Sequence, residues 1–137
     1  MIWPQDFESW LFCLCLWREA RGTSDDAITG VACSIRNRTL KPAWWNGDKA
    51  GSYQAVILCP MQYSSFNRMD ANSTKFPFAE DTVMPRIAHI AQSIVDGSQP
   101  DCVGGAQSYY DISIPPPDWT RSMEFTVQLG PFKFYRV

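Results

Sequence analysis

The strongest pattern in the chain is an almost unbroken run of apolar side chains near its start, within residues 4–21. The large apolar residues recur at intervals of three and four positions, which is the spacing of a helix with one face in a core. Most of the remaining positions are apolar as well, and Gly22 follows the last of them as a helix stop. The pattern predicts a helix over residues 4–21 that is buried at the centre of the domain.

Three later segments also have helical spacing. Ser24, followed by two aspartates, is a suitable N-cap for a helix that ends at the basic group 36–38. Residues 53–58 form a short helical run before a proline, and residues 82–96 form a longer one before Gly97. We therefore expect two further full helices and one short helix.

The last third of the chain changes to short runs that are typical of strands. We predict extended structure at residues 108–114, 123–129 and 132–137, and also at residues 62–66. Helices first and a small antiparallel β element late indicate an α+β fold. A length of 137 residues suits one domain, so we expect residues 1–137 to form a single unit.

The composition indicates a globular protein and argues against two classes of partner. Hydrophobic residues make up 45% of the chain and charged residues 19%, which is ample for a core. The net charge is −2 and no run of lysine or arginine occurs, so we expect no nucleic-acid partner. The apolar run at residues 10–17 is too short to span a bilayer and is not framed as a signal peptide. We expect synthesis in the cytoplasm, no stable membrane insertion, and a monomer.

The cysteines and the single histidine indicate neither a disulfide framework nor a metal centre. The cysteines are odd in number and lack a CxxC pair, so we expect buried free thiols and a reducing compartment. His89 is the only histidine, which makes a catalytic zinc site hard to assemble. We therefore expect no metal and no cofactor. The five cysteines are Cys13, Cys15, Cys33, Cys59 and Cys102.

Glu19 is the residue whose position is best suited to acid catalysis. It stands at the C-terminal end of the first predicted helix, on the same side as Phe12 and Cys15. Apolar surroundings and the negative end of the helix dipole would raise its pKa, while Arg18 and Arg21 would lower it. A carboxyl group that stays protonated near neutral pH can donate a proton to a glycosidic oxygen. The alternative is a surface glutamate in an ion pair with one of the two arginines.

The same region resembles a known family. The segment at residues 17–38 reads WREARGTSDDAITGVACSIRNR, and it resembles the signature of the cell wall hydrolases typified by spore cortex-lytic enzymes. At one position the chain departs from the family, because Phe132 stands where the family has a terminal histidine. Further similar segments follow in the family's order and cover nearly the whole chain: PMQYSSF at 60–66, IVDG at 94–97 with Pro100, GAQSYYD at 105–111, PDW at 117–119 and LGPFKFY at 129–135.

The resemblance implies a lysozyme-like α+β fold, mainly helical, and cleavage of the β-1,4 bond between N-acetylmuramic acid and N-acetylglucosamine. Glu19 would be the catalytic acid. Gln62, Ser64 and Tyr109 or Tyr110 would line the cleft beside it. Peptidoglycan glycan strands are thus the expected partner. A lone catalytic domain of this kind is typical of a phage or prophage endolysin, which a separate holin releases from the host cytoplasm to the cell wall.

A second carboxylate would decide between hydrolysis and transglycosylation. A hydrolase needs one at a defined distance from the acid, and Asp70, Asp111 and Asp118 are candidates by residue type alone. A lytic transglycosylase works with one glutamate, which donates a proton and then removes one from the O6 hydroxyl of the sugar. The resemblance favours this second route, which yields a 1,6-anhydromuramoyl product, and a muramidase is the alternative.

Aromatic side chains could stack on the sugar rings of such a substrate. Trp44 and Trp45 stand in a polar segment beside Asn46 and Gly47. Loops of this kind carry binding residues more often than core residues, so we expect this pair to contact substrate.

Two other functions are compatible with parts of the sequence. A Cys–His peptidase or amidase would need His89 as its base, although no cysteine is an evident partner. A catalytically inactive wall-binding or virion structural domain would keep the fold without the activity.

Overall fold

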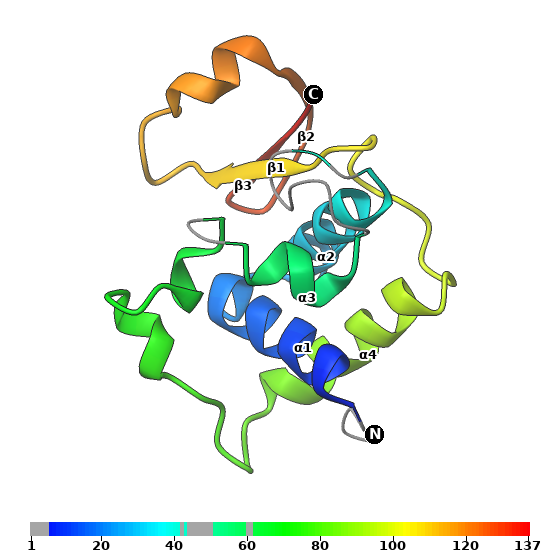
Figure 1. Ribbon diagram of the computed structural model, residues 1–137, viewed down its shortest axis with the longest axis vertical. Coiled ribbons are helices and arrows are strands. Elements are labelled where there is room, and N and C mark those ends of the chain that lie inside the picture. The colour runs from blue at the N-terminus through cyan, green and yellow to red at the C-terminus, as the bar shows by residue number, and fades with distance from the viewer. Residues whose placement is uncertain (1–5, 42, 44–50, 60–61) are drawn as a thin grey trace.

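Within the described part of the chain, four α-helices form the larger share of the fold and a small sheet lies against one end of them (Figure 1). The computed structural model describes residues 6–41, 43, 51–59 and 62–137. The helices are α1 (Phe7–Ala20), α2 (Asp25–Leu40), α3 (Tyr53–Ile57) and α4 (Val83–Val95). The strands are β1 (Ser108–Asp111), β2 (Glu124–Leu129) and β3 (Phe132–Arg136). Short 3-10 helices lie between them: η1 (Ser64–Phe66), η2 (Ala71–Thr74) and η3 (Asp118–Ser122).

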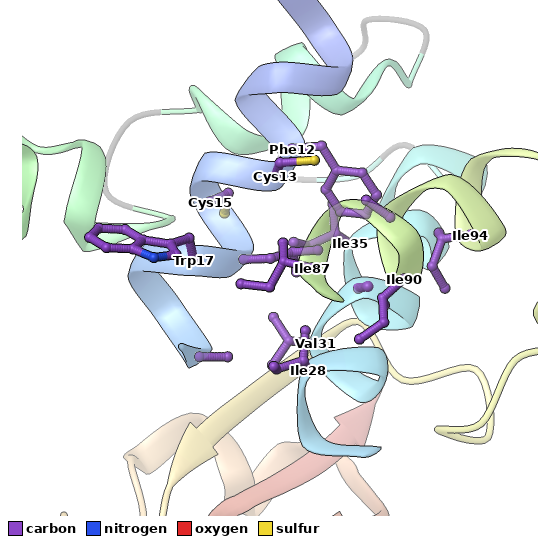
Figure 2. Packing of buried hydrophobic residues seen from close by; sticks show 14 of the residues in the cluster. Phe12, Cys13, Cys15, Trp17, Ile28, Val31, Ile35, Ile87, Ile90 and Ile94 are labelled. Atoms are coloured by element: carbon purple, nitrogen blue, oxygen red, sulfur yellow. The ribbon is translucent and has the colours of Figure 1, made fainter. Parts of the chain in front are cut away.

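The helix α1 is the centre of the core, as its apolar sequence predicts. The Asp6 side chain accepts a hydrogen bond from Ser9 N at 2.8 Å and so caps the first turn. Every residue from 11 to 18 is buried, and the helix packs against α2, α3 and α4. Figure 2 shows isoleucines of α2 and α4 gathered beside α1. This packing leaves the last turn of α1, which carries Glu19, at the edge of the core.

The three strands form an antiparallel sheet in the order β1-β3-β2, so the last strand of the chain lies in the middle. Gly130, in the turn between β2 and β3, has a φ of +56°, a conformation that favours glycine. Successive side chains of a strand point to opposite faces. In β1 this alternation sends Tyr109 and Tyr110 to different faces of the sheet.

The sheet approaches α2 most closely at Gly30. A Cβ atom added to Gly30 would lie 2.8 Å from Leu129 Cδ1 and 2.9 Å from Phe134 Cζ. These distances are shorter than a normal carbon–carbon contact. The absence of a side chain at Gly30 therefore lets the sheet pack directly on α2.

The observed elements follow the expected order, with two corrections. Residues 62–66 are not extended, because Phe66 N bonds to Tyr63 O and Asn67 N bonds to Ser64 O, which turns the chain locally. The first strand ends earlier than expected, at Asp111, whose side chain accepts a hydrogen bond from Ser113 N and starts a turn. Among the described residues, no helix combines the length and the apolar character that a membrane span requires.

The cysteines correct a further expectation. All five are free thiols, and Cys13, Cys15 and Cys33 are buried as predicted. Cys59 and Cys102 are partly exposed, because they lie in connecting segments rather than inside the helical core.

Candidate active site

Glu19 lies in the last turn of α1, where a strand from a distant part of the chain reaches it. The hydroxyl of Tyr109, on β1, donates a hydrogen bond to Glu19 Oε1 at 3.2 Å. The side chain of Glu19 is partly buried. The two residues are 90 positions apart, so the packing of the sheet on the helices creates this contact.

The ring of Tyr109 is held by two phenylalanines of β3. Its centre lies 5.3 Å from that of Phe132 in an edge-on arrangement, and 5.7 Å from that of Phe134. Burial raises the pKa of Tyr109, and the charge of Glu19 raises it further. The phenol therefore keeps its proton and donates it to the hydrogen bond. Phe132 stands where the family that the sequence resembles has a histidine, and its ring packs against Tyr109, which contacts Glu19.

The surroundings of Glu19 raise its pKa above the ordinary value for a glutamate. Burial is the largest cause, because it disfavours the charged carboxylate, and the negative charge of Asp70 acts in the same direction. The hydrogen bond from Tyr109 and the nearby hydroxyl of Ser65 lower the pKa, since both stabilise the carboxylate. Burial outweighs them, so Glu19 keeps its proton to a higher pH than a surface glutamate does.

The neighbouring arginines are engaged elsewhere. Arg18 donates hydrogen bonds to three backbone carbonyls within residues 65–75, which ties α1 to that segment. Arg21 donates to the side chain of Asn72 and to carbonyls of its own helix. The interpretation of Glu19 as half of a surface ion pair thus finds no support. Within the described part of the chain, the ion pairs are Arg86–Asp25 and Arg136–Glu124.

The hydroxyl groups of Tyr63 and Ser65 are buried near Glu19. That of Tyr63 makes no hydrogen bond within the described residues, and that of Ser65 has no partner there apart from its interaction with the Glu19 carboxylate. Burial raises the pKa of Tyr63, and the charge of Glu19 is among the smaller causes that act in the same direction. A buried hydroxyl without a partner costs about 1–3 kcal/mol, which a polar group of a bound ligand would offset. The resemblance implied that Ser64 lines the cleft, but the side chain of Ser64 is exposed. The 3-10 turn of η1 buries its neighbour Ser65 instead, and only knowledge of that turn could have found it.

Gln62 joins this part of the site through Arg38, the last buried residue of α2. The Oε1 atom of Gln62 accepts a hydrogen bond from Arg38 Nη1 at 3.2 Å. The same guanidinium donates to the carbonyl of Gln107 and lies 5.4 Å from the centre of the Tyr63 ring. Arg38 therefore connects α2, the turn at Tyr63 and the residues that lead into β1.

Tyr110 lies away from Glu19, in an aromatic cluster on the opposite face of the sheet. Its ring centre is 6.2 Å from that of Trp119 and 6.1 Å from that of Tyr135. Of the two tyrosines considered, the structure thus brings Tyr109 to the candidate acid. The expected substrate contacts at Trp44 and Trp45 lie outside the described residues.

One of the three candidate second carboxylates lies near Glu19. Asp70 is the carboxylate whose charge contributes to the pKa of Glu19, and its side chain also accepts a hydrogen bond from Asn72 N at 2.8 Å. Asp111 makes a turn with Ser113, and Asp118 begins η3 beyond the sheet. Of the three candidates, Asp70 is therefore the one whose charge acts on Glu19.

The arrangement gives no support to a Cys–His enzyme. His89 is exposed on α4, whereas Cys13 and Cys15 are buried in α1. Burial raises the pKa of both thiols, which is the reverse of what an activated nucleophile needs. Among the described residues, no three side chains of metal-binding type come together.

Comparison with known proteins identifies a similar fold. No family model matches the chain, and no curated protein sequence does. The structure is similar to the catalytic domain of the germination-specific lytic transglycosylase SleB from Bacillus anthracis, with a TM-score of 0.72. The match covers 98% of this chain and 100% of that chain, at 16% sequence identity. The fold is therefore of the mainly helical, lysozyme-like α+β class that the sequence predicts.

Proposed function

We propose that this chain cleaves the glycan strands of bacterial peptidoglycan, at the β-1,4 bond between N-acetylmuramic acid and N-acetylglucosamine. The proposal rests on the surroundings of Glu19. Its side chain is partly buried, its pKa is raised, and its carboxyl group accepts a hydrogen bond from Tyr109. The similarity in fold to the catalytic domain of a lytic transglycosylase supports it. The resemblance of residues 17–38 to the cell wall hydrolase signature supports it independently of the fold.

Glu19 acts first as an acid. Its raised pKa keeps the carboxyl group protonated, so that it can transfer a proton to the oxygen of the glycosidic bond as that bond breaks. The carboxylate that forms is buried, and the hydrogen bond from Tyr109 stabilises it at this moment. Positive charge develops on the muramoyl ring as the bond breaks, and the negative charge of the Glu19 carboxylate opposes it.

Glu19 then acts as a base in the route that we favour. The carboxylate takes the proton of the muramoyl O6 hydroxyl, and that oxygen attacks C1 to close a 1,6-anhydro ring. The route needs one carboxyl group that changes between two protonation states. The opposed influences of burial and Tyr109 on its pKa suit this double use. A muramidase, in which Asp70 assists an attacking water, is the second candidate because the charge of Asp70 acts on Glu19.

The proposal is tested by Glu19→Gln, with Glu80→Gln as the matched control on an exposed loop. Glutamine keeps the shape of the side chain but cannot donate a proton as a carboxylic acid does. We expect the release of soluble fragments from purified peptidoglycan to fall by at least about 10²-fold, while the control retains activity. Near-normal activity of Glu19→Gln would remove the assignment. A wild-type protein that binds the glycan without cutting it would point to an inactive wall-binding domain.

Mass spectrometry of the wild-type products separates the two routes. A transglycosylase leaves 1,6-anhydromuramoyl ends, which are lighter by one water than reducing ends. Reducing ends, together with loss of activity in Asp70→Asn, would establish a muramidase instead. An origin in a phage or prophage, the site of action after release, and the role of Trp44 and Trp45 stay predictions of the sequence.

A further inference from the structure

Two cysteines far apart in the chain lie side by side. Cys33 is buried in α2, and Cys102 lies in the segment between α4 and β1. The thiol of Cys102 points to Cys33 Sγ, with the two sulfur atoms 3.6 Å apart. They are separated by 69 positions in sequence, so the contact belongs to the tertiary structure.

We propose that Cys33 and Cys102 are a disulfide-forming pair, which closes when the protein meets an oxidising environment. Two sulfur atoms in contact need to approach by about 1.6 Å to reach the bond length of a disulfide. Small rotations of the two side chains supply a movement of this size. Cys102 is partly exposed, which gives an oxidant access to the pair although Cys33 is buried.

The surroundings of Cys33 favour its reactive thiolate. The S–H group of Cys102 donates to Cys33 Sγ, and this bond is the largest cause that lowers the pKa of Cys33. Burial and the negative charge of Asp101 oppose the shift, while the Arg36 guanidinium, with Nη2 at 3.9 Å from the sulfur, adds to it. The same hydrogen bond raises the pKa of Cys102, which holds the shared proton. The pair therefore has one nucleophilic sulfur and one accessible sulfur.

A small-molecule disulfide such as oxidised glutathione is a sufficient oxidant. The Cys33 thiolate takes the proton of the adjacent Cys102 thiol, and the accessible Cys102 sulfur attacks one glutathione sulfur. This forms a mixed disulfide and releases one glutathione thiolate, which takes that proton from Cys33. The Cys33 thiolate then attacks the Cys102 sulfur and expels the second glutathione thiolate. The proton of Cys102 thus ends on the first glutathione thiolate, and the second takes its proton from water. The cysteine pair is oxidised by two electrons and the glutathione disulfide is reduced by two.

The new bond would strengthen a contact that hydrogen bonds already make. Arg36 donates to the carbonyls of Ile94 and Gln99, and Asn37 donates to Asp101 and to the carbonyl of Ala106. The end of α2 thus already holds the segment that leads into β1. A disulfide at Cys33 and Cys102 makes this connection covalent and restricts the unfolded chain across a long loop.

The test is oxidation of the purified full chain with oxidised glutathione, followed by alkylation, intact mass and non-reducing peptide mapping. Before alkylation, the wild type should lose about 2 Da through loss of two hydrogens. After alkylation, peptide mapping should give one cross-linked peptide pair that contains residues 33 and 102. The Tm of the wild type should rise by roughly 5–15 °C on oxidation and fall again with a reductant. None of these measurements depends on glycan cleavage, so they can fail while the proposed function holds, or the reverse.

Three variants complete the test. Cys102→Ser should lose both the cross-link and the rise in Tm, whereas Cys33→Ala should retain glutathione on Cys102 as a stable mixed disulfide. Cys59→Ser, at the other partly exposed cysteine, should behave as the wild type does. The peptide map of the wild type needs no variant, so it stays decisive if Cys33→Ala does not fold. A wild type that remains fully reduced, keeps glutathione on Cys102, or cross-links through Cys59 would overturn the proposal.

Discussion

Individual side chains around Glu19 act on its pKa in opposite directions. Burial and the charge of Asp70 raise the pKa, while Tyr109 and Ser65 lower it. A surface glutamate would be ionised at neutral pH, and a fully buried one without a donor would not release its proton readily. The hydrogen bond from Tyr109 partly offsets the effect of burial, so the pKa of Glu19 lies between these two cases.

Tyr109→Phe should therefore alter both the rate and its pH dependence. The acid form of Glu19 starts the reaction, so activity is lost as pH rises through the pKa of Glu19. Removing the hydrogen bond from Tyr109 raises that pKa, which moves the alkaline limb of the kcat profile to higher pH. We also expect kcat to fall about tenfold or more, because the buried carboxylate loses a donor.

The matched control for this change is Tyr110→Phe, on the opposite face of the same strand. It removes one hydroxyl from β1 without touching Glu19, so the alkaline limb should stay in place. Equal shifts in both variants would mean that the sheet as a whole, rather than one hydrogen bond, sets the pKa.

Among the elements, α2 joins the helices to the sheet. Gly30 permits its close approach to Leu129 and Phe134, and Arg38 at its end connects it to Gln62 and Gln107. The sheet in turn presents Tyr109 to the end of α1. The position of the candidate acid relative to its hydrogen-bond donor thus depends on how α2 packs.

Gly30→Ala should disturb this packing. The added methyl group would lie within 3 Å of side-chain carbons of both Leu129 and Phe134, so these side chains or the strands that carry them must shift. We expect a loss of about 1–3 kcal/mol in the free energy of unfolding, measured by denaturant titration. Gly22→Ala is the control, because a Cβ atom there meets nothing within 4 Å. If Gly30→Ala is as stable as this control, Leu129 and Phe134 accommodate the methyl group without loss of free energy, and the prediction is wrong.

In the whole molecule, the candidate site is assembled from parts that are distant in sequence. The last turn of α1 supplies Glu19, the turn at η1 supplies Tyr63 and Ser65, and β1 supplies Tyr109. Such a site requires the complete fold to bury the carboxyl group. Its raised pKa is therefore also a cost to the stability of the folded state.

Glu19→Gln should reduce that cost in a pH-dependent way. The folded-state pKa of Glu19 is raised, so its ionisation destabilises the fold as pH rises above the unfolded value of about 4.3. At about pH 3 both states are protonated and the variant should gain little. At about pH 7 it should unfold at a higher Tm than the wild type. Thermal unfolding across this pH range measures the difference, and a gain that is equal at both pH values would contradict this account.

Local patterns in the sequence predicted the order of the helices and strands and proposed Glu19 as the candidate acid. The apolar period and helix stops predicted α1, α2 and α4 to within a few residues, because helices depend on local spacing and on groups at their ends. Glu19 could be proposed because it ends an apolar helix and because residues 17–38 resemble the cell wall hydrolase signature, whereas its position in the helix alone left a surface ion pair open. The fold class followed from the order of the elements.

The side chains that surround Glu19 could be identified only from the packing of the folded chain. The choice of Tyr109 over Tyr110 depends on which face of β1 meets the helices, and no local pattern states this. The burial of Ser65 rather than Ser64 depends on a 3-10 turn with two backbone hydrogen bonds. The pairing of Cys33 with Cys102 depends on the packing of α2 against a segment 69 positions away. Long-range contacts of this kind form because the whole core closes at once, so the spacing of residues along the chain does not contain them.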